Sequence, residues 1–207
     1  MFLISRWIEA DQHPGHWFAI MEETAKQSII PEDWDDFVEF INQHRDEIAF
    51  GRYDLRIEKD WARDLTSEDL LLLIEHCPSS RLTIASATKS TDVLERLATD
   101  ASSDVREAVA DNVRTSTVTL DSLSSDPAAA VRMAVAENAN VSAANLERLA
   151  SDPVNYVRWG VAHNEKTPSA VLELIVEDQD GYVRDEARRN PNAPKRGFWS
   201  RLFKKKE

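Results

Sequence analysis

The sequence has very little glycine and cysteine. It holds 5 glycines in 207 residues, and the closest two, Gly181 and Gly197, lie 16 positions apart. A glycine-rich phosphate-binding loop of either standard spacing is therefore excluded. The single cysteine, Cys77, excludes an internal disulfide framework and any zinc or iron–sulfur site built from four thiolates. We predict no cofactor.

Long hydrophobic runs are also missing. The apolar letters that begin the chain are interrupted by Arg6 and Glu9, well short of a signal-peptide core or a membrane span. We therefore expect a cytoplasmic protein. With 42% hydrophobic and 30% charged residues, the composition is typical of a folded chain of one domain, or one domain with an appendage.

Positive charge is scarce in most of the chain. The net charge is −12, and residues 1–80 hold 18 acidic but only 7 basic side chains. This excess of negative charge repels the phosphates of nucleic acid, so nucleic acid is disfavoured as a partner. A basic protein or peptide is a more suitable partner for a negatively charged surface. Only residues 194–207, with 6 basic side chains and 1 acidic one, could attract phosphate or an anionic lipid surface.

A period of 26 residues runs through the second half of the chain. The strings DVREAVADN, AVRMAVAEN, YVRWGVAHN and YVRDEARRN begin at positions 104, 130, 156 and 182. The same step links four leucines and four aspartates: Leu94, Leu120, Leu146 and Leu172, and Asp100, Asp126, Asp152 and Asp178. A degenerate earlier copy is visible at 66–88. Agreement of several independent columns indicates a true internal repeat.

Each unit predicts two short helices. Val131, Ala134 and Val135 form the apolar stripe of the first helix, and Leu146 and Leu149 form that of the second. An asparagine follows each first helix, at 112, 138, 164 and 190, where we expect the left-handed conformation that ends helices. Helices of about 8–10 residues are marginal alone, so the units must stack on one another.

The pattern D-x4-VRxxVAxN, followed by T-P-x3-L-x2-L, resembles the variant leucine-rich repeat of bacterial proteins, which is HEAT-like in shape. The clearest copy spans 151–178, and the resemblance covers about residues 80–193. It implies an all-α, or nearly all-α, fold: a right-handed α–α superhelix. It implies no activity. Some relatives carry a cysteine-rich iron–sulfur segment, and this chain lacks those cysteines.

We accordingly predict three parts: an N-terminal, mostly helical capping region at 1–65, a repeat solenoid at 66–193, and a basic aromatic C-terminal capping helix or tail at 194–207. In the first part, Trp34, Phe37, Ile41, His44 and Ile48 share one helical face, a second helix is expected at about 16–27, and the alternation around 52–58 is typical of a strand. This region would cap the solenoid or recognise a partner with its acidic surface. The tail could also contact a membrane, which is not favoured.

Two sets of residues invite a ligand interpretation but have a simpler one. The arginine column at 106, 132, 158 and 184 could bind phosphate, yet an aspartate in register with each arginine favours a structural ladder. His13 and His16 could form half of a metal site, although a loop before a helix explains them as well.

Function is expected where the repeat stops repeating. On the first helices the side chains opposite the apolar stripe differ from unit to unit, and Trp159 is conspicuous because tryptophan is enriched at binding hot spots. It could equally pack on a neighbouring unit. The candidate protein-binding residues are Met133, Glu137, Tyr156, Trp159, His163, Tyr182, Asp185 and Arg189.

The leading hypothesis is a non-catalytic scaffold that binds a protein or peptide, because no residue set has the spacing of a known catalytic motif. Two alternatives stay open. One is an acidic inhibitor or immunity-type protein for a basic toxin or nuclease. The other is a HEAT-like DNA-binding or DNA-repair enzyme, which would need a basic groove. The oligomeric state cannot be inferred from the sequence.

Overall fold

The computed structural model describes residues 27–29, 34–49, 53–55, 57 and 59–194. The chain forms two compact units, Met1–Leu97 (unit 1) and Ala98–Glu207 (unit 2). Within the described ranges every element is helical except one pair of three-residue strands, in agreement with the expected all-α class. No helix in these ranges is long and apolar enough to cross a membrane.

Unit 1 contains the predicted amphipathic helix. Helix α1 (Trp34–Ala49) buries Phe37, Ile41 and Ile48, as the spacing predicted, and bends at the half-buried His44. Strand β2 (Tyr53–Leu55) confirms the strand that the alternating pattern predicted, and it pairs in parallel with β1 (Gln27–Ile29). Gln27 thus begins a strand and does not end the helix expected at about 16–27, whose other residues lie outside the described ranges.

The rest of unit 1 is a set of short helices around an apolar core. They are α2 (Lys59–Asp64), α3 (Ser67–His76), the 3₁₀ turn η1 (Pro78–Ser80), α4 (Arg81–Ala87) and α5 (Thr91–Leu97). The Thr66 hydroxyl caps α3 by accepting a hydrogen bond from the Asp69 amide. Helix α1 packs on α3, and α3 packs on α5. The Phe37 ring, which is buried in the core, stacks on Trp61 with centroids 4.9 Å apart.

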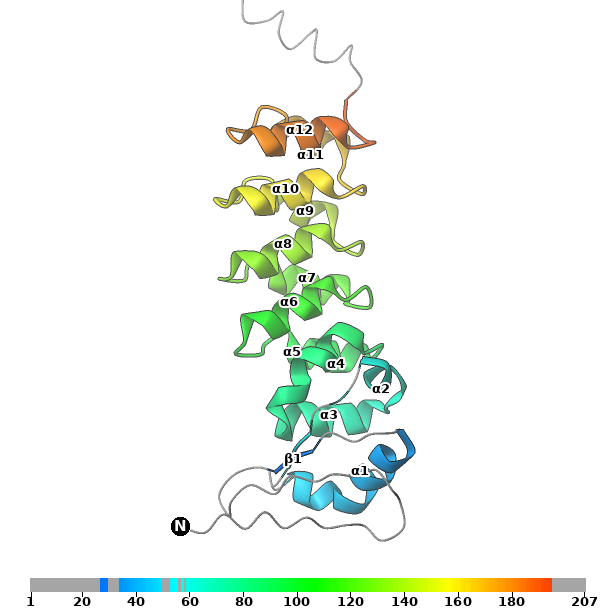
Figure 1. Cartoon of the computed structure of the whole chain (residues 1–207). Coiled ribbons are helices and arrows are strands. Elements are labelled where there is room, and N and C mark those ends of the chain that lie inside the picture. Colours follow the sequence, from blue (N-terminus) through cyan, green and yellow to red (C-terminus); the bar gives the residue numbers. More distant parts are fainter. Residues whose placement is uncertain (1–26, 30–33, 50–52, 56, 58, 195–207) are drawn as a thin grey trace, which may run out of the picture. The chain divides into compact units, whose positions relative to one another are not determined.

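Unit 2 alternates nine-residue first helices with seven-residue second helices. The first helices are α6 (Ser103–Asp111), α8 (Ala129–Glu137), α10 (Asn155–His163) and α12 (Gly181–Arg189), and the second helices are α7 (Thr117–Leu123), α9 (Ala143–Leu149) and α11 (Ser169–Ile175). Helix α6 packs on α8, α8 on α10 and α10 on α12, so the first helices stack in chain order (Figure 1). The leucine column is buried at Leu120, Leu146 and Leu172.

The asparagine column ends the first helices, but the expected left-handed conformation is wrong. Asn138 has φ −65° and ψ 133°, an extended backbone, and the other three asparagines are similar. The reason lies in the side chain. The buried Asn138 amide donates to the carbonyls of Ala110 (2.6 Å) and Asn112 (3.1 Å) in the preceding unit, while its Oδ1 accepts from the Asn140 amide. The asparagines therefore join units as well as ending helices.

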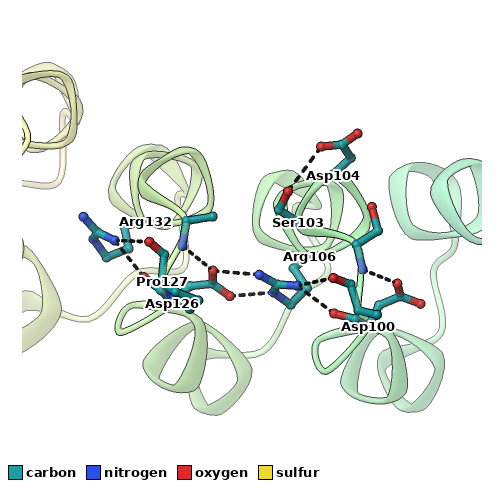
Figure 2. A network of polar contacts seen from close by, with 10 residues as sticks. Asp100, Ser103, Asp104, Arg106, Asp126, Pro127 and Arg132 are labelled. Carbon is teal, nitrogen blue, oxygen red and sulfur yellow. Dashed lines mark hydrogen bonds and ion pairs between the residues drawn. The ribbon is translucent and has the colours of Figure 1, made fainter.

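The arginine column forms the expected structural ladder (Figure 2). Arg106 donates from Nε and Nη2 to the two carboxylate oxygens of Asp126, at 2.6 and 3.0 Å, and from Nη1 to the Asp100 carbonyl at 2.7 Å. The same three bonds recur at Arg132 with Asp152 and at Arg158 with Asp178. The carboxylate thus comes from the following unit, whereas the aspartate six residues before each arginine supplies only its carbonyl.

The ladder keeps its aspartates charged. Burial alone would raise the pKa of Asp126 and of Asp152, but hydrogen bonds from the arginine and from a backbone amide lower each pKa below its ordinary value. At Asp178 the effect of the hydrogen bond from Arg158, which lowers the pKa, is larger than the opposing effect of burial. Each rung is therefore a nearly buried, fully hydrogen-bonded ion pair.

Several predicted features lie outside the described ranges. These are the histidine pair His13 and His16, most of the expected helix at 16–27, and the basic tail at 195–207 with its three alternative roles. Unit 1 contains the predicted capping region at 1–65 together with the beginning of the segment assigned to the solenoid.

Candidate protein-binding surface

Six of the eight predicted binding residues form two columns of side chains on the stacked first helices, and Glu107 and Asp111 of α6 occupy the same two columns. We call these eight side chains the first-helix row: Glu107 and Asp111 on α6, Met133 and Glu137 on α8, Trp159 and His163 on α10, and Asp185 and Arg189 on α12. Each pair is spaced i, i+4 and so shares one face of its helix. Because the helices pack in order, the row continues from unit to unit. The ladder arginines and asparagines do not belong to it.

An aromatic pair lies on α10. The rings of Trp159 and His163 stack with centroids 4.8 Å apart and planes 11° apart. Trp159 is half-buried, and the His163 side chain is 56% exposed. The two expectations for Trp159 are thus both compatible with its position, since part of the indole is covered and part remains available.

Helices α8 and α10 approach closely beside this pair. A Cβ atom on Gly160 would lie 3.3 Å from the Cβ of Ala136 and 3.4 Å from the Cγ of Glu137. Gly160 is buried, and its missing side chain allows the stem of Glu137 to lie against α10. The glycine therefore brings a carboxylate of α8 next to the helix that carries the tryptophan.

A polar connection links α10 to α12. His163 Nδ1 lies 2.8 Å from Glu186 Oε1, and the other oxygen of Glu186 lies 3.7 Å from Arg189 Nη1. Glu186 was not among the predicted binding residues. Its column otherwise holds Ala108, Ala134 and Gly160, so a glutamate among small residues was the signal that could have identified it.

Three carboxylates of the row, on α6 and α8, hold their protons more tightly than usual. Burial is the largest cause that raises the pKa of Glu107, Asp111 and Glu137. At Glu137 the charge of Asp111 raises the pKa further, while His163 lowers it. The Glu137 carboxylate thus lies within electrostatic reach of Asp111 on α6 and of His163 on α10. A partly desolvated negative surface of this kind gains most from a cation.

The remaining predicted residues lie outside this group, and all of them except Met133 are exposed. Tyr156 is 43% exposed in the first turn of α10, and Tyr182 is 84% exposed in the first turn of α12. Asp185 lies 3.6 Å from the Arg188 guanidinium, and Met133 is half-buried on α8. The structure therefore stacks Trp159 on His163 and links His163 through Glu186 to Arg189. Glu137 lies against α10 beside this group, and the two tyrosines lie in the first turns of α10 and α12.

The row is suited to contact with another molecule. It offers an indole, a thioether and carboxylates, which are groups that bind partners through packing and charge. Among the residues that the structure describes, no group of three or more histidine, cysteine, aspartate and glutamate side chains could hold a metal ion. The carboxylates of the row also repel phosphate, which disfavours the DNA-binding alternative at this surface.

In comparisons with known proteins, no family model matches the chain and no curated protein matches it.

Proposed function

We propose that the protein is a helical-repeat scaffold that binds a basic protein or peptide segment through the first-helix row. In this proposal the 26-residue units form a right-handed α–α superhelix of the variant leucine-rich repeat, HEAT-like kind. One observation carries it. The buried side chains that join the units are the same in successive units, whereas the exposed row changes its chemistry at every helix.

Electrostatics supports a basic partner. Three carboxylates of the row have raised pKa values, because burial and like charge disfavour their ionised form. A lysine or arginine side chain that docks beside Glu137 and Asp111 relieves this cost, since it supplies the opposite charge. The neighbouring Trp159 adds an aromatic surface that attracts cations as well as apolar groups.

The test is a binding measurement with defined peptides. Full-length protein is applied to immobilised 12-residue peptides that contain lysine and arginine, with matched peptides in which glutamine replaces both. We expect saturable binding to a subset of the basic peptides only. Trp159→Ala and Glu137→Gln should each weaken that binding about tenfold or more, the size of a hot-spot loss.

A matched control is available on the second helices. Leu174 on α11 is 59% exposed and lies outside the first-helix row. Leu174→Ala should leave peptide binding unchanged. Equal losses for Leu174→Ala and Trp159→Ala, or binding that ignores peptide charge, would contradict the proposal.

An inhibitor of a basic toxin or nuclease would use the same carboxylates, so the acidic-inhibitor alternative remains a second candidate. The two are separated by the form of the partner. A scaffold for peptides binds short extended segments, whereas an inhibitor binds a folded basic protein and ignores peptides cut from it. Running the same row variants against a folded cationic protein therefore distinguishes the two functions.

A further inference from the structure

The ladder of arginines ends on α12 with a rung that has no aspartate. Arg106, Arg132 and Arg158 each hold a carboxylate of the aspartate 20 residues later. For Arg184 the corresponding position is 204, which is lysine. Arg184 therefore has no register partner in the sequence, and no described carboxylate forms an ion pair with it.

Arg184 is nevertheless held in the orientation of a ladder arginine. Its Nη1 donates to the Asp178 carbonyl at 2.5 Å, which is the bond that anchors each inner arginine to its own turn. The side chain is half-buried, and its Nη2 lies 3.6 Å from the position that a Cβ on Gly181 would occupy. The edge formed by Nε and Nη2, which binds the carboxylate at every inner rung, is thus preorganised, and no carboxylate of the described residues occupies it.

The surroundings favour an acidic occupant over another stacked unit. Arg188 follows one turn after Arg184, in the column that holds Ala110, Ala136 and Ala162 in the preceding units. Those alanines are buried between units, whereas Arg188 is exposed. A second arginine at this place hinders the close approach of another helix but adds positive charge beside the open rung.

We propose that Arg184, assisted by Arg188, is a docking site for an aspartate of an acidic partner polypeptide. The carboxylate would accept two parallel hydrogen bonds from Nε and Nη2, as Asp126, Asp152 and Asp178 do inside the stack. The inner aspartates also show the preferred form of the ligand: each accepts a hydrogen bond from the amide two residues later, so it lies in a tight turn. The proposal does not depend on partner binding by the first-helix row, although Arg188 lies 3.6 Å from Asp185 of that row.

The probe is a copy of an inner turn. The capped tetrapeptide Ser-Asp-Pro-Val repeats residues 151–154, whose aspartate binds Arg132 within the chain. It is titrated into the full-length protein while the Nε–Hε signals of the arginines are followed by NMR. We expect a saturable shift of the Arg184 signal, and no shift with the matched peptide Ser-Asn-Pro-Val, because asparagine carries no charge.

Variants distinguish the contribution of the two-bond guanidinium edge of Arg184 from that of its positive charge. Arg184→Lys keeps the charge but removes the two-bond edge, so binding should weaken about tenfold or more. Arg188→Gln should weaken it less, and Arg114→Gln, at an exposed arginine in the loop after α6, should have no effect. Thermal melting of each variant confirms that the fold is kept.

Four results would overturn the proposal. The first is an Arg184 signal that does not move, and the second is equal binding of the two peptides. The third is tighter binding of inorganic phosphate than of the aspartate peptide, which would assign the site to phosphorylated ligands. The fourth is a clear gain of peptide binding in Glu207→Gln, which would show that Glu207, the one acidic side chain of residues 195–207, competes for the site.

Discussion

The two sides of the first helices in unit 2 differ in kind. On one side, arginine, aspartate and asparagine recur every 26 residues, are largely buried and join each unit to the next. On the other side, the residue type at one repeat position changes in every unit: it is Glu107, Met133, Trp159 and then Asp185. A helix of nine residues can separate these tasks because each face contacts different surroundings. Under our proposal, substitutions on the ladder side change stability, and substitutions in the row change recognition with only small effects on stability.

The largest expected effect is on the ladder side. Arg158→Gln should lower the free energy of unfolding by about 3–5 kcal/mol, since it leaves the nearly buried Asp178 carboxylate without its partner. Chemical denaturation measures the loss, with the exposed Arg114→Gln as the control. Peptide binding by the remaining folded protein should be unchanged. A loss as small as that of the control would mean that the rungs are not structural.

The asparagine column should show an intermediate effect. Asn164→Ala removes hydrogen bonds to the carbonyls of Ala136 and Asn138 and from the Lys166 amide, so we expect a loss of about 1–3 kcal/mol. Asn155→Ala is the matched comparison, because Asn155 is exposed and donates only to the Asp180 carboxylate. Equal losses at 155 and 164 would contradict a special role for the buried column.

The two sides should also respond oppositely to pH. The ladder aspartates have folded pKa values below the ordinary 3.8, so the stability they add is complete above that value and is lost as pH falls through the folded pKa values. Glu107, Asp111 and Glu137 of the row have raised pKa values, so the folded state loses stability as pH rises from the ordinary to the folded pKa of each.

Denaturation at a series of pH values measures both trends. In Asp178→Asn the fall in stability below about pH 4 should become shallower, because one depressed group is gone. In Glu137→Gln the same acid fall should remain. An unchanged acid fall in Asp178→Asn would show that its ion pair does not contribute.

The smallest expected effect is on the row. Glu137→Gln should raise the free energy of unfolding at pH 7 by a few tenths of a kcal/mol, since it removes an exposed but partly desolvated charge that lies near Asp111. The gain should vanish near pH 4, where the glutamate takes up a proton. Glu147→Gln, at an exposed position on α9, is the control. A loss of stability in Glu137→Gln would place this carboxylate among the structural groups.

Helix positions and burial could be predicted because they follow from local spacing. The stripe of Val131, Ala134 and Val135 is buried as expected, and Ser142 caps the second helix by accepting from the Asn145 amide. In unit 1 the strand at Tyr53–Leu55 was recognised from its alternation. Its partner was not, because pairing joins segments that no period relates.

Contacts between units were harder to predict. The arginines and aspartates were correctly paired by type, but the carboxylate lies 20 residues after its arginine, and spacing alone does not reveal across which turn a long side chain reaches. The prediction of a left-handed backbone at the asparagines was wrong for a related reason. Their amides have acceptors in the preceding unit, and these hold the backbone extended. Glu186 escaped notice because its partner, His163, lies on the previous first helix.

Each hydrogen bond described between units of unit 2 joins immediate neighbours. A deletion or duplication of one whole 26-residue block would therefore create a seam with the same rungs as every other seam. Genes for such a chain can grow or shrink by blocks without redesign of the interior, and each inserted block would bring one new set of surface side chains. Variation in length is thus a route by which the surface of this architecture can change while its interior stays the same.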